Sequence, residues 1–521
     1  MTSIRRIGAI AAIGALTASA AAIAPVKADE LSDLRANQEV LQQRLDQLAQ
    51  VGTAKPNLPP GSATIAGSFP RSFLIPGTDT SIQIGGYVDL SASYFFTGGA
   101  NNANVAVPPV TGAPVASGLP LAVPVPTSGL YGQQRQYGWF RMQASESRLF
   151  VETRTPTAWG QALTHVEFDF FGCTAGTYCN DLNTATNPDT PRLRLAYGTL
   201  GGFIAGQTWV PGNDLAAAPD IFDFGGDVGG WGWARAPQIG YKTDVPWLYG
   251  ASVGVYAVQP YTQVATPLGS FTDESIGVSV GSSPVAGTPA TLANIAKTQY
   301  PDMALVMNWE QPWGHFQLHG MVKDMELSDG LFLHQNFIGY GGGFSGSVKP
   351  EWFGWSKDNL GFQAFAGDGL GHWNGPPGST TLTYFQGIAT NYGGAGLYGN
   401  PGNPDTATAA VKSTAAGAAA ITATTVFSWG GEVNYQHWWT PNLRSSLTFG
   451  IGHQDLPTHL LGITSTSGYN KEIETAHANL IWSPVPFIDT GFEYIYGHRL
   501  TAANIRGTDE HTLDFDFKVK F

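Results

Sequence analysis

The sequence is poor in charged residues and in long hydrophobic runs. Only 12% of its 521 residues are Asp, Glu, Lys or Arg, about half the share of a typical soluble protein. A soluble enzyme of this length needs more charge to cover its surface. After residue 28, no stretch offers the ~20 uninterrupted apolar residues of a membrane-spanning helix, since Lys412 and several threonines interrupt the best candidate, residues 406–425.

Motifs of catalysis and metal binding are also missing. The sequence contains neither a His-Glu-x-x-His motif nor a P-loop. Its histidines are scattered, without a recognisable pattern of serine or aspartate around them. We therefore expect no enzyme activity, no cofactor and no metal site, and we keep a barrel hydrolase as a less favoured alternative.

The first 28 residues have the pattern of a signal peptide. Arg5 and Arg6 precede an apolar, alanine-rich stretch at residues 7–23, and Val26-Lys27-Ala28 fits a small-x-small cleavage site before Asp29. The alternative, a membrane anchor, is disfavoured because the apolar run is short and a charged stretch follows it. The arginine pair alone is weak support for twin-arginine export.

The mature chain is acidic. Removal of residues 1–28 leaves 23 basic and 39 acidic residues, a formal net charge of −16, which argues against nucleic acid as a partner. A secreted, apolar-rich chain without spanning helices can satisfy its backbone hydrogen bonds in a membrane only as a closed β-barrel.

Residues 29–50 are predicted to form an amphipathic helix with a heptad seam. Such a short helix is marginal alone, so we expect it to bury the seam in a periplasmic coiled coil between subunits, where a buried polar residue helps to set the register. A single helix on the barrel rim is the alternative. Residues 51–80 are predicted to be a linker. The seam residues are Leu31, Leu34, Gln38, Leu41, Leu45 and Leu48.

From Ser81 to the end, residues 81–521, apolar and polar residues alternate with the period of two that β-strands show. Val88 and Leu90 share one face of the first such strand, whereas Asp89 and Ser91 share the other. A soluble β-sandwich can alternate too, but its exposed face would carry more charge.

The lengths of the connections distinguish a membrane barrel from a sandwich, because bacterial barrels alternate short periplasmic turns with longer external loops. Seven short connections and eight long ones predict about sixteen strands, within two. The short turns are expected at 155–160, 200–202, 243–247, 311–314, 349–359, 439–442 and 483–486. The long loops are expected near 97–140, 172–191, 210–232, 260–301, 326–336, 372–426, 456–471 and 499–509.

Aromatic residues support the placement of the short turns at the periplasmic end of the barrel. Tryptophans cluster at the short turns, where barrels carry an interfacial girdle: Trp159, Trp247, Trp313, Trp352 and Trp439. The chain ends in an alternating stretch with terminal Phe521, which resembles the signal read by the bacterial barrel-assembly machinery. These features predict an outer-membrane protein in contact with lipid and lipopolysaccharide.

Two cysteines, Cys173 and Cys179, lie in one of the long loops. In a secreted chain, such an isolated pair favours a local disulfide bond. A metal site would need more ligands nearby.

The predicted lumen carries a basic stripe. We expect these residues to line the channel and favour anions: Arg141, Arg148, Arg154, Arg192, Arg194 and Lys242. If the loop after Pro211 folds inward, its acids would oppose this stripe and narrow the channel: Asp214, Asp220, Asp223 and Asp227. The alternative is that the lumenal charges only pair with one another.

The signal, the leucine seam and the stretch from Phe73 to Leu90, with its Pro-Gly-Thr-Asp-Thr and Gly-Gly-Tyr segments, resemble the DcaP-like trimeric porins. This resemblance implies a homotrimer of sixteen-stranded barrels with a periplasmic coiled coil. It also implies passive uptake of small anionic solutes such as dicarboxylates. The poorly charged loops 97–140 and 372–426 differ from that pattern. A structural or adhesive barrel with little conductance is the alternative function.

Overall fold

The computed structural model describes residues 66–97, 138–172, 190–224, 226–230, 234–260, 262–266, 269–272, 296–328, 334–354, 357–373, 388–390, 422–461, 470–501 and 509–521. The chain divides into two units, Met1–Gly67 and Ser68–Phe521, and the second holds all the strands discussed below. The signal peptide, the leucine seam, and Cys173 with Cys179 lie outside the described residues, so they remain predictions.

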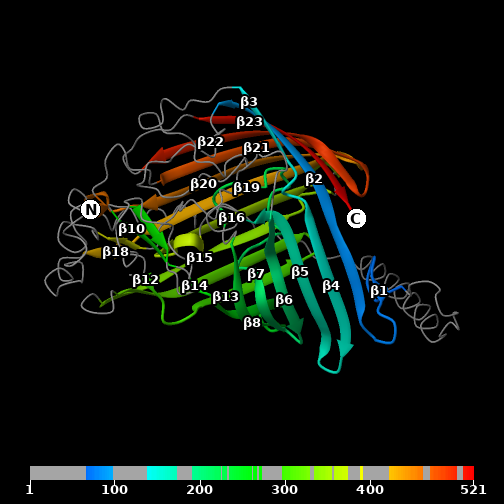
Figure 1. Ribbon diagram of the computed structural model, residues 1–521, viewed down its shortest axis with the longest axis horizontal. Coiled ribbons are helices and arrows are strands. Elements are labelled where there is room, and N and C mark those ends of the chain that lie inside the picture. The colour runs from blue at the N-terminus through cyan, green and yellow to red at the C-terminus, as the bar shows by residue number, and fades with distance from the viewer. Residues whose placement is uncertain are drawn as a thin grey trace. The chain divides into compact units, whose positions relative to one another are not determined.

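Sixteen antiparallel strands close into a barrel, as the sequence predicts (Figure 1). The first long strand, β2 (Ser81–Thr97), pairs on one side with the last, β23 (Glu510–Lys520). On its other side β2 pairs with β4 (Arg148–Thr157) and then β3 (Trp139–Gln143), which together act as one strand interrupted at residues 144–147.

The other strands follow one another around the wall, each paired with its neighbours. They are β5 (Gly160–Gly172), β6 (Thr190–Leu200), β7 (Phe203–Trp209), β8 (Arg235–Val245), β9 (Ala251–Val258), β13 (Asp302–Gln311), β14 (Gly314–Ser328), β15 (His334–Val348), β16 (Asn359–Asp368), β19 (Phe427–Thr440), β20 (Leu443–Asp455), β21 (Asn470–Val485) and β22 (Ile488–Thr501). Fifteen connections join these strands near the predicted places, although the predicted turn at 243–247 lies at 246–250. The connection expected as a long loop at 326–336 is only residues 329–333, which is shorter than the turn at 349–358.

Smaller elements lie among the connections. The short strand β1 (Phe73–Leu74), within the predicted linker, pairs with β2. A separate four-stranded sheet is formed by two loops, the one between β9 and β13 and the one between β16 and β19 (Figure 1): β10 (Gln263–Thr266), β11 (Gly269–Thr272), β17 (Ile388–Thr390) and β18 (Ala423–Thr425). The rest are β12 (Ala296–Lys297), η3 (Trp352–Gly354), η4 (Gly371–Trp373) and α5 (Thr458–Leu461). None of the helices in the described ranges is long and apolar enough to span a membrane.

The two faces of the wall differ in chemistry. On β22, Phe492 is 56% exposed on the outer face, whereas the next residue, Glu493, is fully buried on the inner face. Val88 and Asp89 on β2 show the same contrast. Because successive side chains of a strand point to opposite faces, the alternation in the sequence places apolar residues outside and hydrogen-bonding residues inside.

The tryptophans at the short turns all project outward. Trp159 and Trp247 are 80% and 83% exposed, and Trp313, Trp352 and Trp439 are also exposed. This ring of indoles lies at one end of the barrel, where an aromatic girdle meets the membrane interface. The predicted orientation of the strands therefore agrees with the positions of these side chains.

Glycine is required where the barrel closes. A Cβ atom on Gly86 would lie 2.0 Å from the backbone oxygen of Arg148 on the neighbouring strand. We therefore expect Gly86→Ala to force the two strands apart and to lower the free energy of unfolding by about 1–3 kcal/mol. Urea unfolding of the detergent-folded protein, followed by tryptophan fluorescence, measures this change.

The matched control is Gly320→Ala, because the nearest atom to its new Cβ would be a backbone oxygen 3.6 Å away. Equal unfolding midpoints for the two variants would contradict the steric explanation.

Candidate functional site

The chain between β7 and β8 leaves the wall, and its described residues 210–224 and 226–230 cross the interior of the barrel. We call this segment the inward loop. Its first turn is bound to the inner face of β14 and β15. His315 Nε2 and Ser345 Oγ both donate to one oxygen of Asp214, at 2.7 and 2.6 Å. The base of the loop is thus anchored to a wall that is distant from it in the sequence.

The middle of the inward loop is bound to β19 and β20. The Arg444 guanidinium and the Gln436 amide each donate to Asp220 Oδ2 at 2.6 Å. Asn434 donates to the Ala217 carbonyl at 2.8 Å. The contact with Asn434 satisfies a buried backbone carbonyl, which would cost free energy without a partner, whereas Asp220, with 36% of its side chain exposed, is held by a charge-assisted hydrogen bond from Arg444.

The far part of the inward loop reaches β21 and β22. The backbone amides of Phe222 and Asp223 donate to the two oxygens of Glu493, at 2.7 and 3.2 Å. The amide of Val228 donates to Thr475 Oγ1 at 3.1 Å. The loop therefore lies across the lumen from the strands it leaves to those near the end of the chain.

Close packing against the wall depends on glycine. Gly229 has φ +97°, a conformation that L side chains rarely adopt. On the facing strand β20, a Cβ atom on Gly450 would lie 1.8 Å from the Val228 carbonyl oxygen. The backbone of the loop thus rests directly on the backbone of the wall.

Two loop carboxyl groups are held in different ways. Burial opposes the ionisation of Asp214, but the hydrogen bonds from His315 and Ser345 outweigh it and lower its pKa. Burial raises the pKa of the Asp227 carboxyl to about 6, although the facing Glu432 carboxyl offsets part of this rise. The carboxylate of Asp214 therefore anchors the base of the loop, whereas the buried carboxyl of Asp227 lies beside another acid.

A serine, a histidine and an aspartate form a chain beneath the loop. Ser347 Oγ lies 3.0 Å from His315 Nδ1, and the other nitrogen of this ring binds Asp214. The order resembles that of a hydrolytic triad. All three groups are buried, however, and Asp214 also accepts from Ser345. We interpret this series of three hydrogen-bonded side chains as an anchor for the loop. No sequence motif predicted this anchor.

Arginines gather on the wall at the other side of the loop. Arg192 donates to both oxygens of Asp169, at 2.9 and 2.6 Å. Arg194 bridges Glu167 and Asp169, at 2.7 and 2.8 Å. Arg148 Nε lies 3.5 Å from Glu167. These arginines come from β4 and β6, whereas both acids come from the intervening β5.

An aromatic ring from the inward loop lies against these arginines. The guanidinium carbons of Arg148, Arg192 and Arg194 lie 6.0, 6.0 and 5.2 Å from the centre of the Phe224 ring. Such distances permit cation–π attraction. The ring holds the guanidiniums without adding negative charge, so their positive potential persists.

A further arginine completes this group. Arg235, at the start of β8, lies 4.9 Å from the ring centre of Trp209 and makes no ion pair with any described residue. Among the described residues, four guanidiniums therefore surround only two carboxylates, those of Glu167 and Asp169. We call Arg148, Arg192, Arg194 and Arg235 the arginine cluster.

A second group of buried polar contacts lies at η4. Trp373 Nε1 donates to Asp302 Oδ2 at 2.8 Å, and the Lys323 ammonium lies 3.8 Å from the same oxygen. Lys323 also donates to the Leu370 carbonyl at 3.4 Å. All four side chains are buried, so this segment is packed against the inner wall and not open to the lumen.

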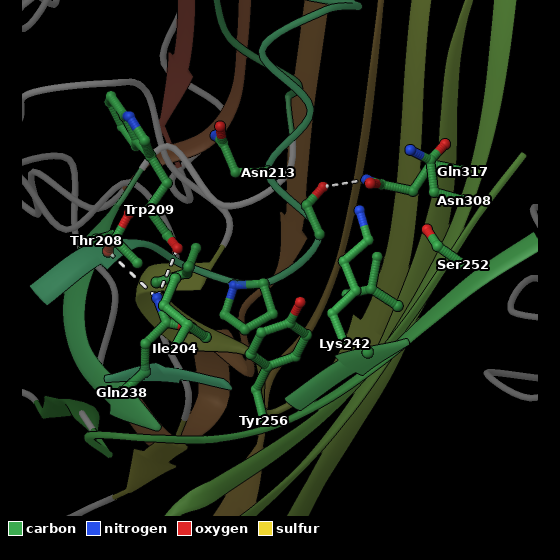
Figure 2. Close-up of a pocket in the computed structure, with 15 residues that line it drawn as sticks. Ile204, Thr208, Trp209, Asn213, Gln238, Lys242, Ser252, Tyr256, Asn308 and Gln317 are labelled. Atoms are coloured by element: carbon green, nitrogen blue, oxygen red, sulfur yellow. Dashed lines mark hydrogen bonds between the residues drawn. The ribbon is translucent and has the colours of Figure 1, made fainter. Parts of the chain in front are cut away.

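A cavity of about 200 Å³ lies between the base of the inward loop and strands β7–β9, β13 and β14. Figure 2 shows the Lys242 side chain directed toward the loop base, between Tyr256 and Gln317. Gln317 donates to the Gly212 carbonyl at 2.8 Å, and Gln238 donates to two main-chain carbonyls at the end of β7. Amide side chains thus hold the loop base over the cavity.

The structure groups only some of the predicted cations. It brings together Arg148, Arg192 and Arg194. Arg154 lies toward the short turns, beside Phe69 and paired with Glu152. Lys242 lines the cavity instead. Arg141 belongs to β3, but its side chain lies outside the described part of the chain.

The loop acids differ from expectation. The sequence suggested that Asp214, Asp220, Asp223 and Asp227 oppose the basic stripe. Instead Asp214 and Asp220 bind donors on the far wall, and Asp227 faces Glu432. Asp223 presents its backbone amide to Glu493. The buried carboxylate of Asp214 needs donors, and His315 and Ser345 on the far wall supply them.

Sequence reasoning missed Arg235, Phe224 and Trp209. Arg235 is the first residue of β8, where the alternation of apolar and polar residues resumes after the inward loop. That resumption could have identified it as a residue of the wall. The role of Phe224 had no such signal, because it depends on how the loop crosses the lumen.

A family model described as a porin subfamily matches residues 70–438. The chain belongs to this porin family. Among solved structures, the outer membrane channel DcaP of Acinetobacter baumannii aligns over 88% of the porin and 100% of its own chain, with a TM-score of 0.57 and 18% identity. The alignment with the anion-selective porin from Comamonas acidovorans covers 85% of this chain and 100% of that porin's chain, with a TM-score of 0.46 and 10% identity. No curated protein matches the sequence significantly.

The family and the closed barrel together identify the porin as a bacterial outer-membrane channel. The likeness to DcaP supports the barrel fold. Membership in this family places the chain among channels and not among enzymes. The inward loop and the arginine cluster are then features of the channel's interior.

The contact between Gly450 and Val228 predicts how the loop can be displaced. Gly450→Val puts a side chain where the Val228 carbonyl lies, so we expect the far part of the loop to leave the wall. Single-channel recordings should then show altered and noisier conductance, while the barrel remains folded.

Gly198→Ala serves as the control, because its Cβ would meet only the Leu163 carbonyl, at 3.4 Å. A Gly450→Val channel with the conductance and noise of Gly198→Ala would show that the loop is not held at this point.

Proposed function

We propose that the porin is a passive diffusion channel that prefers small anions, with dicarboxylate-like solutes as its preferred class. The observation that carries this proposal is the excess of guanidinium over carboxylate in the arginine cluster. The cluster faces the inward loop, which occupies part of the lumen. A permeating solute therefore passes close to these charges.

Two members of the cluster have the most charge to offer. Arg235 has no ion-pair partner within the described ranges, and Arg148 meets Glu167 only at 3.5 Å. Guanidinium groups can bind carboxylates through two parallel hydrogen bonds. Two such groups near each other suit a solute with two carboxylates better than one with a single carboxylate.

The acidic total charge of the chain is compatible with anion preference. Several inner-wall acids already have cationic partners: Asp489 contacts Arg444 and Lys520, and Glu493 contacts His477. Exposed charges more than about 8 Å apart are largely screened at physiological salt. Groups at the narrowing therefore govern selectivity more than the total charge does.

Ion selectivity tests the proposal directly. In planar bilayers with a potassium chloride gradient, we expect the wild-type reversal potential to indicate preference for chloride. Arg235→Gln should reduce this preference, because it removes a charge that no described carboxylate compensates. Arg154→Gln is the matched control, since Arg154 lies outside the cluster and pairs with Glu152.

The proposal fails if the wild-type channel prefers cations, or if Arg235→Gln and Arg154→Gln have the same selectivity. For the solute class, succinate should reduce the chloride current at lower concentration than acetate does, and Arg235→Gln should diminish that difference. Equal inhibition by the two acids would remove the dicarboxylate preference while leaving anion preference intact.

We also propose that the porin is a homotrimer tied by the leucine seam of residues 29–50. The support is the heptad spacing of five leucines and Gln38 in the sequence. Deletion of residues 29–50 should lower the temperature at which the trimer dissociates. Samples incubated at a series of temperatures and then run on a gel without boiling measure this temperature. The heat-sensitive mobility of the barrel itself should stay unchanged.

An equal dissociation temperature for the deletion variant and the wild type would exclude this role of the seam.

We further propose that the outer-membrane barrel contacts lipid, lipopolysaccharide and the barrel-assembly machinery. The exposed apolar outer face supports the first two. For the third, Phe521 is 53% exposed and exchanges backbone hydrogen bonds with Gly86 at the closing seam. Its side chain is thus accessible at the end of the last strand.

A further inference from the structure

Where the first and last strands meet, the inner wall carries an unusual concentration of acid. In the antiparallel register of β2 and β23, Asp89 lies opposite Lys518, and Asp516 lies opposite Ser91. Asp89 and Asp516 both point to the inner face and are fully buried. Two carboxyl groups on neighbouring strands are thus placed side by side at the seam that closes the barrel.

The interruption between β3 and β4 adds a third carboxyl group. Ser147 Oγ accepts from the Asp89 amide at 3.0 Å, which holds the interruption against β2. Glu146, only 2% exposed, then projects to the same place and accepts from Gln143 at 3.1 Å. One oxygen from each of Asp89, Glu146 and Asp516 lies within 4.8 Å of the others.

The hydrogen-bonding needs of this group are not met. Neither oxygen of Asp516 receives a hydrogen bond from any described residue, although the side chain is completely buried. The Lys518 ammonium lies 2.9 Å from Asp89 Oδ2. Three carboxylates against one ammonium leave two negative charges uncompensated, and a buried charge without a partner is strongly unfavourable.

We propose that Asp89, Glu146 and Asp516 bind a divalent cation at the closing seam, with Ca²⁺ as the preferred ion. A divalent cation supplies the two positive charges that the site lacks. Its ligands would be carboxylate oxygens alone, which suit the hard cations Ca²⁺ and Mg²⁺, whereas zinc sites favour histidine or cysteine. Ca²⁺ accepts irregular arrangements of carboxylates more readily than Mg²⁺ does.

Such an ion would link three segments that are far apart in the sequence: the first strand, the interruption before β4, and the last strand. It would also lie close to the arginine cluster. The Tyr87 ring centre is 5.0 Å from the Lys518 ammonium and 5.1 Å from the Arg148 guanidinium carbon. No motif predicts this site, because its three ligands stand far apart in the sequence, at positions 89, 146 and 516.

Calorimetry on the full mature chain in detergent, stripped with EDTA and then freed of chelator, tests the proposal. Titration with CaCl₂ at pH 7.5 should show saturable binding of one ion per chain, with weaker binding of MgCl₂. Asp516→Asn should weaken Ca²⁺ binding at least tenfold. The matched control is Asp244→Asn, which removes an exposed carboxylate of β8 and should bind as the wild type does.

Thermal unfolding supplies an independent measurement. Because a ligand that binds only the folded state stabilises it, Ca²⁺ should raise the unfolding temperature of the wild type and of Asp244→Asn, but not that of Asp516→Asn. Glu146→Gln is the second variant if Asp516→Asn does not fold. Crystals of the wild type soaked in MnCl₂ should show an anomalous peak among the three carboxylates.

Absence of saturable Ca²⁺ and Mg²⁺ binding by the wild type would overturn the proposal, as would wild-type affinity in both Asp516→Asn and Glu146→Gln. The neighbouring carboxyl groups would then share protons in place of a metal ion. Weak cation binding by lipopolysaccharide or by exposed acids is common to all the variants and so does not mimic the expected difference.

Discussion

Backbone hydrogen bonding in apolar surroundings is the constraint on which the rest of this structure depends. A chain that exposes apolar side chains to lipid must pair every backbone N–H and C=O group within itself. The pairing of β2 with β23 meets this requirement by leaving no free edge in the wall. The period of two then places every second residue inside the barrel. These inward positions can be polar or charged, so the interior surface is polar.

An interior built in this way can bind a loop without an apolar core. The inward loop is held mainly by carboxylates, amides and hydroxyls on the opposite wall, with Asp214, Asp220 and Glu493 as the central acceptors. Because these acids have their donors on that wall, they are not available to neutralise the arginine cluster. The inner wall thus carries its anchoring acids on one side and an excess of guanidinium over carboxylate among the described residues on the other.

The sequence predicts the wall better than it predicts the interior. The number of strands, the short turns and the outward tryptophans follow from local patterns, because turn residues and alternation act over a few positions. The partners of the inward loop do not: His315 lies 101 residues from Asp214, and Arg444 lies 224 residues from Asp220. Phe224 reaches the arginines, and Glu146 reaches Asp516, only through the path of the folded chain.

The closing seam also bears on how such a protein can be made. One edge of its first long strand, β2, has no lasting partner until the final residues of the chain have been synthesised and exported. Throughout that interval, one strand edge and an apolar face remain open to any other chain nearby. Biogenesis therefore calls for a holding chaperone in the periplasm, and a product truncated by even one strand would stay adhesive and subject to proteolysis.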